Sequence, residues 1–574
     1  MSSLFRKKQV SKLLEDAEKG FSEGEDSRGL NKVLGVKDLT ALGVAATIGA
    51  GVFSTIGKAC FDGGPGVVYL FIIIAVTCGF SALCYAEFAS RIPVSGSAYT
   101  YSYASFGELI AWIIGWDLIM EYAVGNITVA ISWSGNLTTF LDGMGLHIPS
   151  FLTKSFLEIR NGHVQFQELV AAHKLIPTDV LSMENLWNNA PHIGSMPLIF
   201  NFPALIITVL ITMLVYVGIK ESRNTGNLMV IFKVCVILLV IAIGIFHVNP
   251  VNWHPFTPNG MTGVLKGTSA VFFAYIGFDA ISTTAEECRN PQRDLPRGMI
   301  YSLIISTLIY IAVALVLTGM VKYTDLGGEA FMANAFTKIG LNWIGGLIAL
   351  SAVIATASVL LVFQIGQPRI WMSMSRDGLL PKKFSTIHPK YKTPSFSTVV
   401  TGFAVGIPSL ILDQNLVTDL CSIGTLFAFI LVCGGIMILQ GNDRIDAGSI
   451  RPKFKVPYLN AQFIFPVFLG LVILFFYKTY PDELRSFYSF DGGWAEIQHR
   501  IPNYIFIILC VVLCLNGFRK KYSLIPVLGL VSCGYLMTTL GTMNWLRFVI
   551  WLIIGLVIYF SYGRYKSKLA PGNQ

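Results

Sequence analysis

The sequence predicts an all-α protein embedded in a membrane, with about fourteen membrane-spanning helices. Hydrophobic residues make up 53% of the 574 residues, and charged residues make up only 13%. A water-soluble globular chain carries about 25% charged residues, so this composition excludes one. Apolar stretches of about 20 residues, the length that a helix needs to cross a bilayer, also follow one another along most of the chain.

These apolar stretches can be placed one by one along the sequence. We expect the spans near residues 38–58, 66–89, 107–139, 198–219, 226–247, 263–286, 299–320, 341–368, 395–413, 416–439, 459–478, 502–517, 523–541 and 544–563. The third stretch is longer than a bilayer crossing requires, and the twelfth is short. A polar segment at about 140–197 is expected to fold over the outer face.

Lysine and arginine determine the expected orientation. With the N-terminus in the cytoplasm, most of the 42 Lys and Arg residues fall on the cytoplasmic side, as the positive-inside rule requires. We therefore expect both termini in the cytoplasm, and we assign the net charge of +9 to the cytoplasmic loops instead of to nucleic-acid binding. The ten cysteines contain no CxxC pair and lie mostly within apolar stretches, which predicts no metal or disulfide framework.

Glycine interrupts two of the predicted spans, at Thr47–Gly51 in the first and at Ala274–Asp279 in the sixth. Non-helical backbone at membrane depth survives only where it is buried in protein or lines a cavity. Two spans that are five apart cross the membrane in opposite directions, as in a five-plus-five inverted repeat with interrupted helices 1 and 6. The alternative is that these glycines only let helices pack closely.

The predicted organisation follows from these spans. It consists of a cytoplasmic N-terminal segment at 1–37, a ten-helix core at 38–440, four additional membrane helices at 441–563 and a cytoplasmic tail at 564–574. The repeats within the core are 38–247 and 263–440, and the first of them carries the outer loop 140–197.

Several long stretches resemble one known family. They include "GVAATIGAGVFSTIGKA" (43–59), "LCYAEFASRIPVSGSAYTYSY" (83–103), "FFAYIGFDAISTTAEECRNP" (272–291) and "IGQPRIWMSMSRDGLLPKKF" (365–384). The chain resembles the amino acid–polyamine–organocation superfamily and, within it, bacterial members of the cationic amino acid transporter family. Two added apolar segments before residue 525 depart from many bacterial relatives.

The resemblance implies a secondary active amino acid transporter of the cell (inner) membrane that works by alternating access, with no enzymatic activity, cofactor or metal. Its expected partners are an amino acid, cationic or small and neutral, together with protons and membrane lipids. An exchanger without proton coupling and an amino acid-sensing transceptor remain alternatives. The sequence also shows no cluster of acid–base or metal-binding groups that a membrane-embedded enzyme would need.

An interrupted helix offers free N–H groups to a carboxylate and free carbonyls to an ammonium. An amino acid needs both, because burial removes the water that solvates its charges. The residues expected at the substrate carboxylate are Thr47, Ile48, Gly49, Ala50 and Gly51, and those expected at the ammonium are Ala274, Tyr275 and Gly277. The resemblance implies the same roles, and it implies that Phe273 closes over the substrate; the alternative for Phe273 is ordinary packing.

Lys233 lies about ten residues into the otherwise apolar fifth span. A lysine at membrane depth indicates function, and burial disfavours its charged form. Snorkelling toward the membrane surface is the alternative. In proton-coupled relatives, a lysine from this helix lies near the first interruption, so the resemblance implies proton coupling through Lys233 without a metal ion.

Three carboxylates lie within predicted spans. Asp117 and Glu121 are four residues apart and so share one face of the third span, and Asp279 directly follows the second interruption. Glu121 or Asp279 is expected to meet a cationic side chain, or to pair with Lys233 through water and so take part in proton coupling. The alternative is a structural ion pair or a protonated acid in a packed interior.

Overall fold

A computed structural model describes residues 4–8, 32–49, 51–92, 94, 96–327, 331–442, 452–479 and 493–570. Helices form the framework of these residues, which confirms the predicted all-α class. A small antiparallel hairpin, β1 (His192–Ile193) with β2 (Met196–Pro197), lies in the segment predicted to fold over one face. The predicted site residue Ala50 and most of the N-terminal segment lie outside the described residues.

Within the described residues, nine helical stretches are long and apolar enough to cross a membrane, or ten if one bent pair is counted as a single span. The helices in these stretches are α2 (Val36–Thr47), α3 (Ile56–Gly63), α4 (Val67–Arg91), α6 (Glu108–Gly143), α10 (Ile219–Ile245), α11 (Gly260–Lys266), α12 (Thr268–Tyr275), α13 (Pro291–Met320), α15 (Asn342–Arg376), α17 (Gln414–Asn442), α20 (Gly493–Lys520), α22 (Thr542–Ile558) and α23 (Arg564–Lys566).

Four further apolar helices are shorter, namely α9 (Phe202–Val217), α16 (Ser395–Ser409), α18 (Ala461–Thr479, with its apolar part at Ala461–Leu474) and α21 (Leu524–Thr538). Each of the fourteen predicted spans coincides with one of these long or short helices. Because four of them fall short of the length needed for a crossing, the number fourteen stays a prediction.

Both predicted interruptions are present. Helix α2 ends at Thr47, and Ile48 is extended (φ −82°, ψ 91°) before the chain continues as one π turn and then α3. Helix α12 ends at Tyr275, Ile276 is extended (φ −62°, ψ 138°), and Gly277 has φ +118°. Only glycine adopts such a positive φ without strain, so Gly277 makes the second interruption possible.

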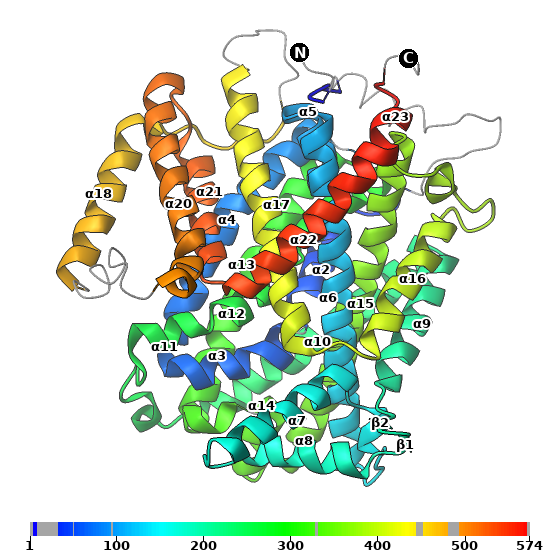
Figure 1. Cartoon of the computed structure of the whole chain (residues 1–574), viewed down its shortest axis with the longest axis vertical. Coiled ribbons are helices and arrows are strands. Elements are labelled where there is room, and N and C mark those ends of the chain that lie inside the picture. Colours follow the sequence, from blue (N-terminus) through cyan, green and yellow to red (C-terminus); the bar gives the residue numbers. More distant parts are fainter. Residues whose placement is uncertain are drawn as a thin grey trace.

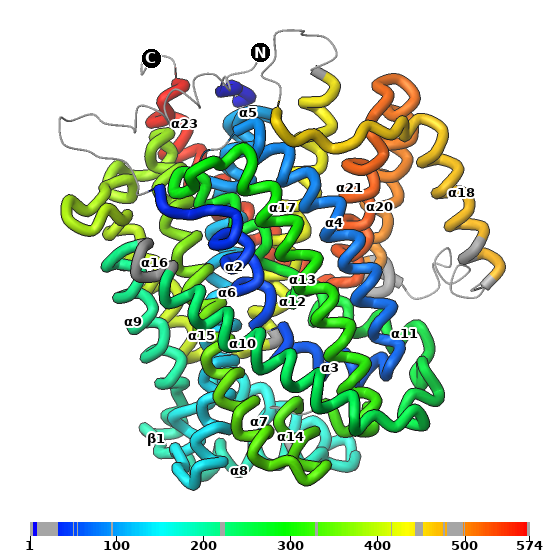
Figure 2. Tube along the Cα trace, turned by 180° about the vertical axis from the view of Figure 1, so that it is seen from behind, coloured from blue at the N-terminus to red at the C-terminus, as the bar shows by residue number. Residues whose placement is uncertain are grey.

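Helix α6 packs against α15 and α17, while α13 packs against α2 and α4. Figures 1 and 2, which show opposite sides of the molecule, place the two interrupted helices among these long helices. The extended residues of the two interruptions, Ile48 and Ile276, are buried in protein, as irregular backbone within a membrane protein requires.

The described segments nearest the two chain ends, residues 4–8 and α23, lie at the same end of the molecule (Figure 1). Arg6 Nη1 donates a hydrogen bond of 2.5 Å to the carbonyl of Leu569, which ties the two terminal segments together. Helices α7 (Phe156–Ala171) and α8 (Thr178–Asn189) lie at the opposite end with the hairpin. The shared end agrees with the prediction that both termini face one side, and its assignment to the cytoplasm stays a prediction.

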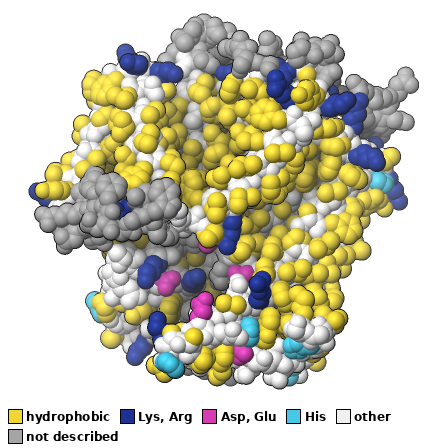
Figure 3. All heavy atoms as spheres, viewed as in Figure 1, with side chains coloured by type: hydrophobic (Ala, Val, Ile, Leu, Met, Phe, Trp, Pro, Cys, Tyr) yellow, Lys and Arg dark blue, Asp and Glu magenta, His cyan; other side chains and the backbone are white. Residues whose placement is uncertain are grey.

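On the face that Figure 3 shows, hydrophobic side chains dominate the helical body, and Lys, Arg, Asp and Glu lie mainly toward the two ends. Helices α18, α20 and α21 stand together at one side (Figure 1), where α18 contacts α20 and α21. Phe463, Val467 and Leu471 of α18 are largely exposed, as expected for a helix that faces lipid.

Candidate functional site

The two interruptions touch each other. An added Cβ at Gly51 would lie 2.6 Å from Ala274 Cβ and 2.8 Å from Ala274 Cα, and an added Cβ at Gly277 would collide with Ala46. An added Cβ at Gly49 would collide with Val359 of α15. In this structure these glycines let backbone approach backbone; the prediction that they also leave room for a ligand stays a prediction.

Tyr310 of α13 joins the two interruptions. Its hydroxyl lies 2.6 Å from the Thr47 carbonyl and 2.7 Å from the Ala274 carbonyl. A hydroxyl has one hydrogen to donate, so the two carbonyls share it or alternate. The Thr47 hydroxyl also lies 2.6 Å from the Ser306 hydroxyl, one turn before Tyr310. The carbonyl predicted to receive an ammonium, that of Ala274, is therefore held by Tyr310.

Sequence reasoning missed Tyr310. The signal that could have found it is the polar pair Ser306 and Tyr310, four residues apart on one face of the seventh predicted span. Which helix that face meets depends on tertiary packing, so the pair alone does not point to the interruptions.

Lys233 of α10 is fully buried against the first interruption. Its Nζ donates to the carbonyls of Ala45 (2.9 Å) and Ile48 and to the Ser358 hydroxyl (2.8 Å) of α15. A protonated lysine has three donors, and the three acceptors match them. The snorkelling alternative is wrong for this structure, because the ammonium contacts the interrupted backbone and not the membrane surface.

The carboxylates Asp117, Glu121 and Asp279 are all buried. Both oxygens of Asp117 and both of Glu121 have no hydrogen-bond partner among the residues that the structure describes. Asp279 Oδ2 is within 3.4 Å of the Tyr122 hydroxyl, and its Oδ1 has no partner there. A buried charge without a partner is costly, so these acids either carry a proton or await a cation.

No ion pair joins Lys233 to Glu121 or Asp279 within the described part of the chain. The lysine therefore lies at the first interruption, Asp117 and Glu121 lie on α6, and Asp279 follows the second interruption. Their predicted link through water stays a prediction. The carboxylate of Asp117 faces α17, where its Oδ1 would lie 3.0 Å from a Cβ added to Gly424.

Phe273 and Tyr275 occupy the last turn of α12, and both are buried. The Tyr275 hydroxyl donates to the carbonyl of Phe71 in α4 (3.3 Å), and its ring packs edge-on against Tyr310 with centroids 5.2 Å apart. The side chain of Tyr275 thus holds α12 against α4 and α13. The gating role of Phe273 stays a prediction.

Two ion pairs join the end of the second interrupted helix to α15. Arg369 pairs with Glu287 at 2.6 Å, with both groups buried, and Arg376 pairs with Glu286 at 2.9 Å. Each of these two glutamates therefore has an arginine partner on α15. The Glu287 carbonyl also accepts hydrogen bonds from the backbone just before α2, at Val33 and Leu34.

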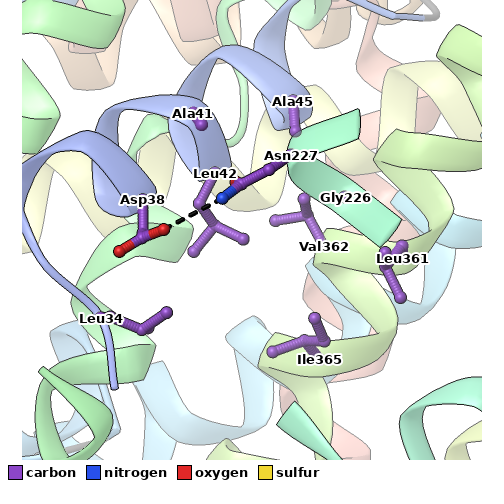
Figure 4. A pocket seen from close by; sticks show the side chains of 10 residues that line it. All are labelled: Leu34, Asp38, Ala41, Leu42, Ala45, Gly226, Asn227, Leu361, Val362 and Ile365. Atoms are coloured by element: carbon purple, nitrogen blue, oxygen red, sulfur yellow. Dashed lines mark hydrogen bonds between the residues drawn. The ribbon is translucent and has the colours of Figure 1, made fainter. Parts of the chain in front are cut away.

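A small pocket lies between α2, α10 and α15 (Figure 4). Asn227 of α10 donates a 3.0 Å hydrogen bond to the carboxylate of Asp38, near the start of α2. The cavity measures about 20 Å³, which is room for one water molecule. Ala45 lines this cavity and also supplies a carbonyl to Lys233, so the pocket adjoins the backbone that the lysine holds.

Comparison with known proteins gives the family. A sequence profile described as "Amino acid permease" matches residues 34–494, and one described as the C-terminus of such permeases matches residues 522–567. The chain belongs to the amino acid permease family. The resemblance to the amino acid–polyamine–organocation superfamily is thereby confirmed, and this permease is a multi-pass membrane protein.

Relatives of this permease differ in what they are named for. A branched-chain amino acid permease of Bacillus subtilis is 36% identical over 99% of each chain. A methylthioribose transporter of the same bacterium is 35% identical over 99% of this chain and 100% of its own. The vacuolar cationic amino acid transporter 2 of Arabidopsis thaliana is 31% identical over 99% of this chain and 93% of its own.

Proposed function

We propose that this permease is a secondary active amino acid transporter that couples uptake to protons by alternating access. The observation that carries the proposal is the contact between two interrupted helices, with the buried Lys233 ammonium on the backbone of the first. The proposed architecture is the five-plus-five inverted repeat of residues 38–247 and 263–440, followed by the additional helices of 441–563. The membrane is the cell (inner) membrane, with both termini in the cytoplasm.

The substrate backbone binds between the interruptions. Its carboxylate meets the N–H groups of residues 47–51, and its ammonium meets the carbonyls near Ala274 and Gly277. Tyr310 holds the Ala274 carbonyl in this structure, so the ammonium takes that acceptor over, and Phe273 closes the site.

The substrate side chain is cationic in this proposal. Glu121 and Asp279 supply buried carboxylate oxygens without hydrogen-bond partners in the described residues, and a positive side chain would satisfy them. The names of the relatives do not decide the substrate, since a methylthioribose transporter and a branched-chain amino acid permease are about equally similar to this chain. A small neutral amino acid remains the second candidate.

Lys233 couples transport to protons through its contacts. The protonated amine fills three acceptors on α2 and α15. A neutral amine has two hydrogens, so it can donate to only two of these three acceptors. Deprotonation therefore loosens α2 from α10 and α15, which allows the first interrupted helix to move.

Uptake into proteoliposomes tests the proposal. The purified full-length permease is given each of the twenty amino acids and methylthioribose, with and without an acidic exterior. We expect a proton gradient to drive accumulation of arginine or lysine. Uptake that needs internal substrate and ignores the gradient would show an exchanger, and saturable binding without uptake would show a transceptor; either result contradicts proton symport.

A further inference from the structure

A second cavity lies away from the interruptions, between α6, α15, α16, α17 and α22. It measures about 360 Å³, within the range of about 300–1,000 Å³ found for ligand pockets. Its walls are mostly aromatic and aliphatic, and the residues that matter here are Trp116, Met120, Gln367, Trp371, Arg547 and Trp551. Exposed Ala404 of α16 also lines it, so the cavity opens at the surface of the helical body.

Arg547 brings a positive charge to this cavity from within a membrane-spanning helix. It is half-buried, its Nη1 donates to Asn544 Oδ1 at 3.0 Å, and no carboxylate of the described residues lies within ion-pair distance of it. The nearby Asp419 carboxylate already accepts hydrogen bonds from Asn544 and Ser269. A guanidinium has five donors, so most of them are available to a ligand.

The packing of α22 on α6 shows what Arg547 faces. Trp112 Nε1 donates to the Gly555 carbonyl, and Trp116 Nε1 donates to the Trp551 carbonyl. The helices therefore run antiparallel, and each step of four residues along α6 matches a step of four back along α22. The next step places Arg547 opposite Met120.

Two buried polar atoms of the same cavity have no hydrogen-bond partner in the part of the chain that the structure describes. They are Gln367 Oε1, an acceptor, and Trp371 Nε1, a donor, on one face of α15. Gln367 is held by its other end, which donates to the Ile119 carbonyl at 3.3 Å, and the Trp371 ring stacks on Phe384. Gln367 therefore meets α6 at the same level as Arg547.

We propose that this cavity binds one anionic phospholipid from the surrounding bilayer. The phosphate pairs with Arg547, whose guanidinium matches two phosphate oxygens at once. Ester and hydroxyl oxygens of the lipid meet Gln367 and Trp371, and an acyl chain lies along the apolar wall at Val124 and Leu420. A bilayer lipid suits an apolar cavity that opens at the surface of a membrane helix bundle, and its charge complements the unpaired arginine.

The probe is phosphatidylglycerol against phosphatidylcholine with the same acyl chains. The full-length permease in neutral detergent is offered both lipids, retained lipid is counted by native mass spectrometry, and the unfolding temperature is measured. We expect one phosphatidylglycerol to be retained in preference to phosphatidylcholine and to raise the unfolding temperature. Arg547→Gln should lower that preference about tenfold or more, because a charge-assisted pair is lost.

Arg519→Gln is the matched control, because Arg519 is an exposed arginine at the end of α20 and lies outside the cavity. It should keep the full preference. Equal retention of the two lipids, or an equal loss in both arginine variants, would overturn the proposal, since either result means general attraction to the surface. Equal protection by oleate would also overturn it in favour of a carboxylate amphiphile.

Ala404→Phe provides a second variant if Arg547→Gln does not fold. It narrows the surface opening and leaves the arginine in place, so it should reduce the retained phosphatidylglycerol to the level of phosphatidylcholine. Unchanged retention in this variant would place the lipid elsewhere and contradict the proposal. All these measurements are made without substrate or a proton gradient, so their outcome is independent of the proposed transport function.

Discussion

The first interrupted helix and the acidic face of α6, formed by Asp117 and Glu121, differ in whether their buried polar groups have hydrogen-bond partners. At the interruption, the carbonyls of Ala45 and Ile48 bind Lys233, and that of Thr47 binds Tyr310. On α6, the carboxylate oxygens of Asp117 and Glu121 have no partner among the described residues. Buried polar groups are normally hydrogen-bonded.

The difference indicates which region already has its hydrogen-bond partners within the protein and which region lacks them. At the interruption, side chains of α10 and α13 bind carbonyls that lack helical hydrogen bonds. The acidic face is incomplete, so a proton or a cation has to come from outside the described contacts.

Lys233→Met should have the largest effect, because it removes the donor that binds the carbonyls of the first interruption. It leaves three buried acceptors without a donor, at about 1–3 kcal/mol for each unsatisfied group, and it removes the proposed proton carrier. We expect gradient-driven uptake in proteoliposomes to be abolished, while Lys266→Met, at an exposed lysine of α11, keeps it. Undiminished gradient-driven uptake by Lys233→Met would disprove the coupling role.

Gly277→Ala should prevent the two interruptions from meeting. A Cβ there collides with Ala46, and φ +118° is strained for any residue with a side chain. We expect loss of substrate binding, measured as the ligand-induced rise in unfolding temperature. Gly79→Ala in α4 is the control, since an added Cβ there meets nothing within 4 Å; a rise in Gly277→Ala equal to that of the control would count against the site.

Glu121→Gln tests the acidic face of α6, because it removes a carboxylate that has no hydrogen-bond partner among the described residues. We expect arginine uptake to fall by about tenfold or more, because a charge-assisted contact is lost, with uptake of small neutral amino acids retained. The substrate-free protein should become more stable, since a neutral amide is cheaper to bury than an unpaired carboxylate. KM values for arginine and alanine decide the matter, and equal arginine KM in both proteins would exclude Glu121 from the site.

Tyr310→Phe should have the smallest effect. It frees the Thr47 and Ala274 carbonyls and should cost the substrate-free protein about 1–3 kcal/mol of stability, whereas a bound ammonium replaces the lost donor at Ala274. The gap between substrate-free and substrate-bound unfolding temperatures should therefore widen. Tyr301→Phe, at an exposed tyrosine of the same helix, should leave that gap unchanged, and an unchanged gap in Tyr310→Phe would refute the exchange of partners.

Features that depend on local sequence were predicted well. The helices follow from apolar length, and the two interruptions follow from glycine within apolar stretches, because both depend on a few neighbouring residues. The burial of Lys233 was also expected, since a charge in an apolar span must find polar partners. Four of the apolar helices are shorter than a membrane crossing usually requires. The sequence therefore predicts the positions of the helices better than it predicts the number of crossings.

Partners were not predictable in the same way. Glu287 pairs with Arg369 of α15, which lies far from it in the sequence. Tyr310 and the pairing of Asp38 with Asn227 were missed for the same reason. A polar side chain on a helix shows that a partner is needed, and only the packing of helices distant in sequence supplies that partner.

The sequence by itself determined an all-α membrane protein, the places where two of its helices break, and the residues whose charge is costly at that depth. These depend on hydropathy, on glycine and on chain length, all of which act locally. The tertiary structure alone decided that the two breaks meet, that Tyr310 spans them, and that Lys233 and the acids of α6 occupy separate places. Those facts depend on distances between helices, which local patterns do not specify.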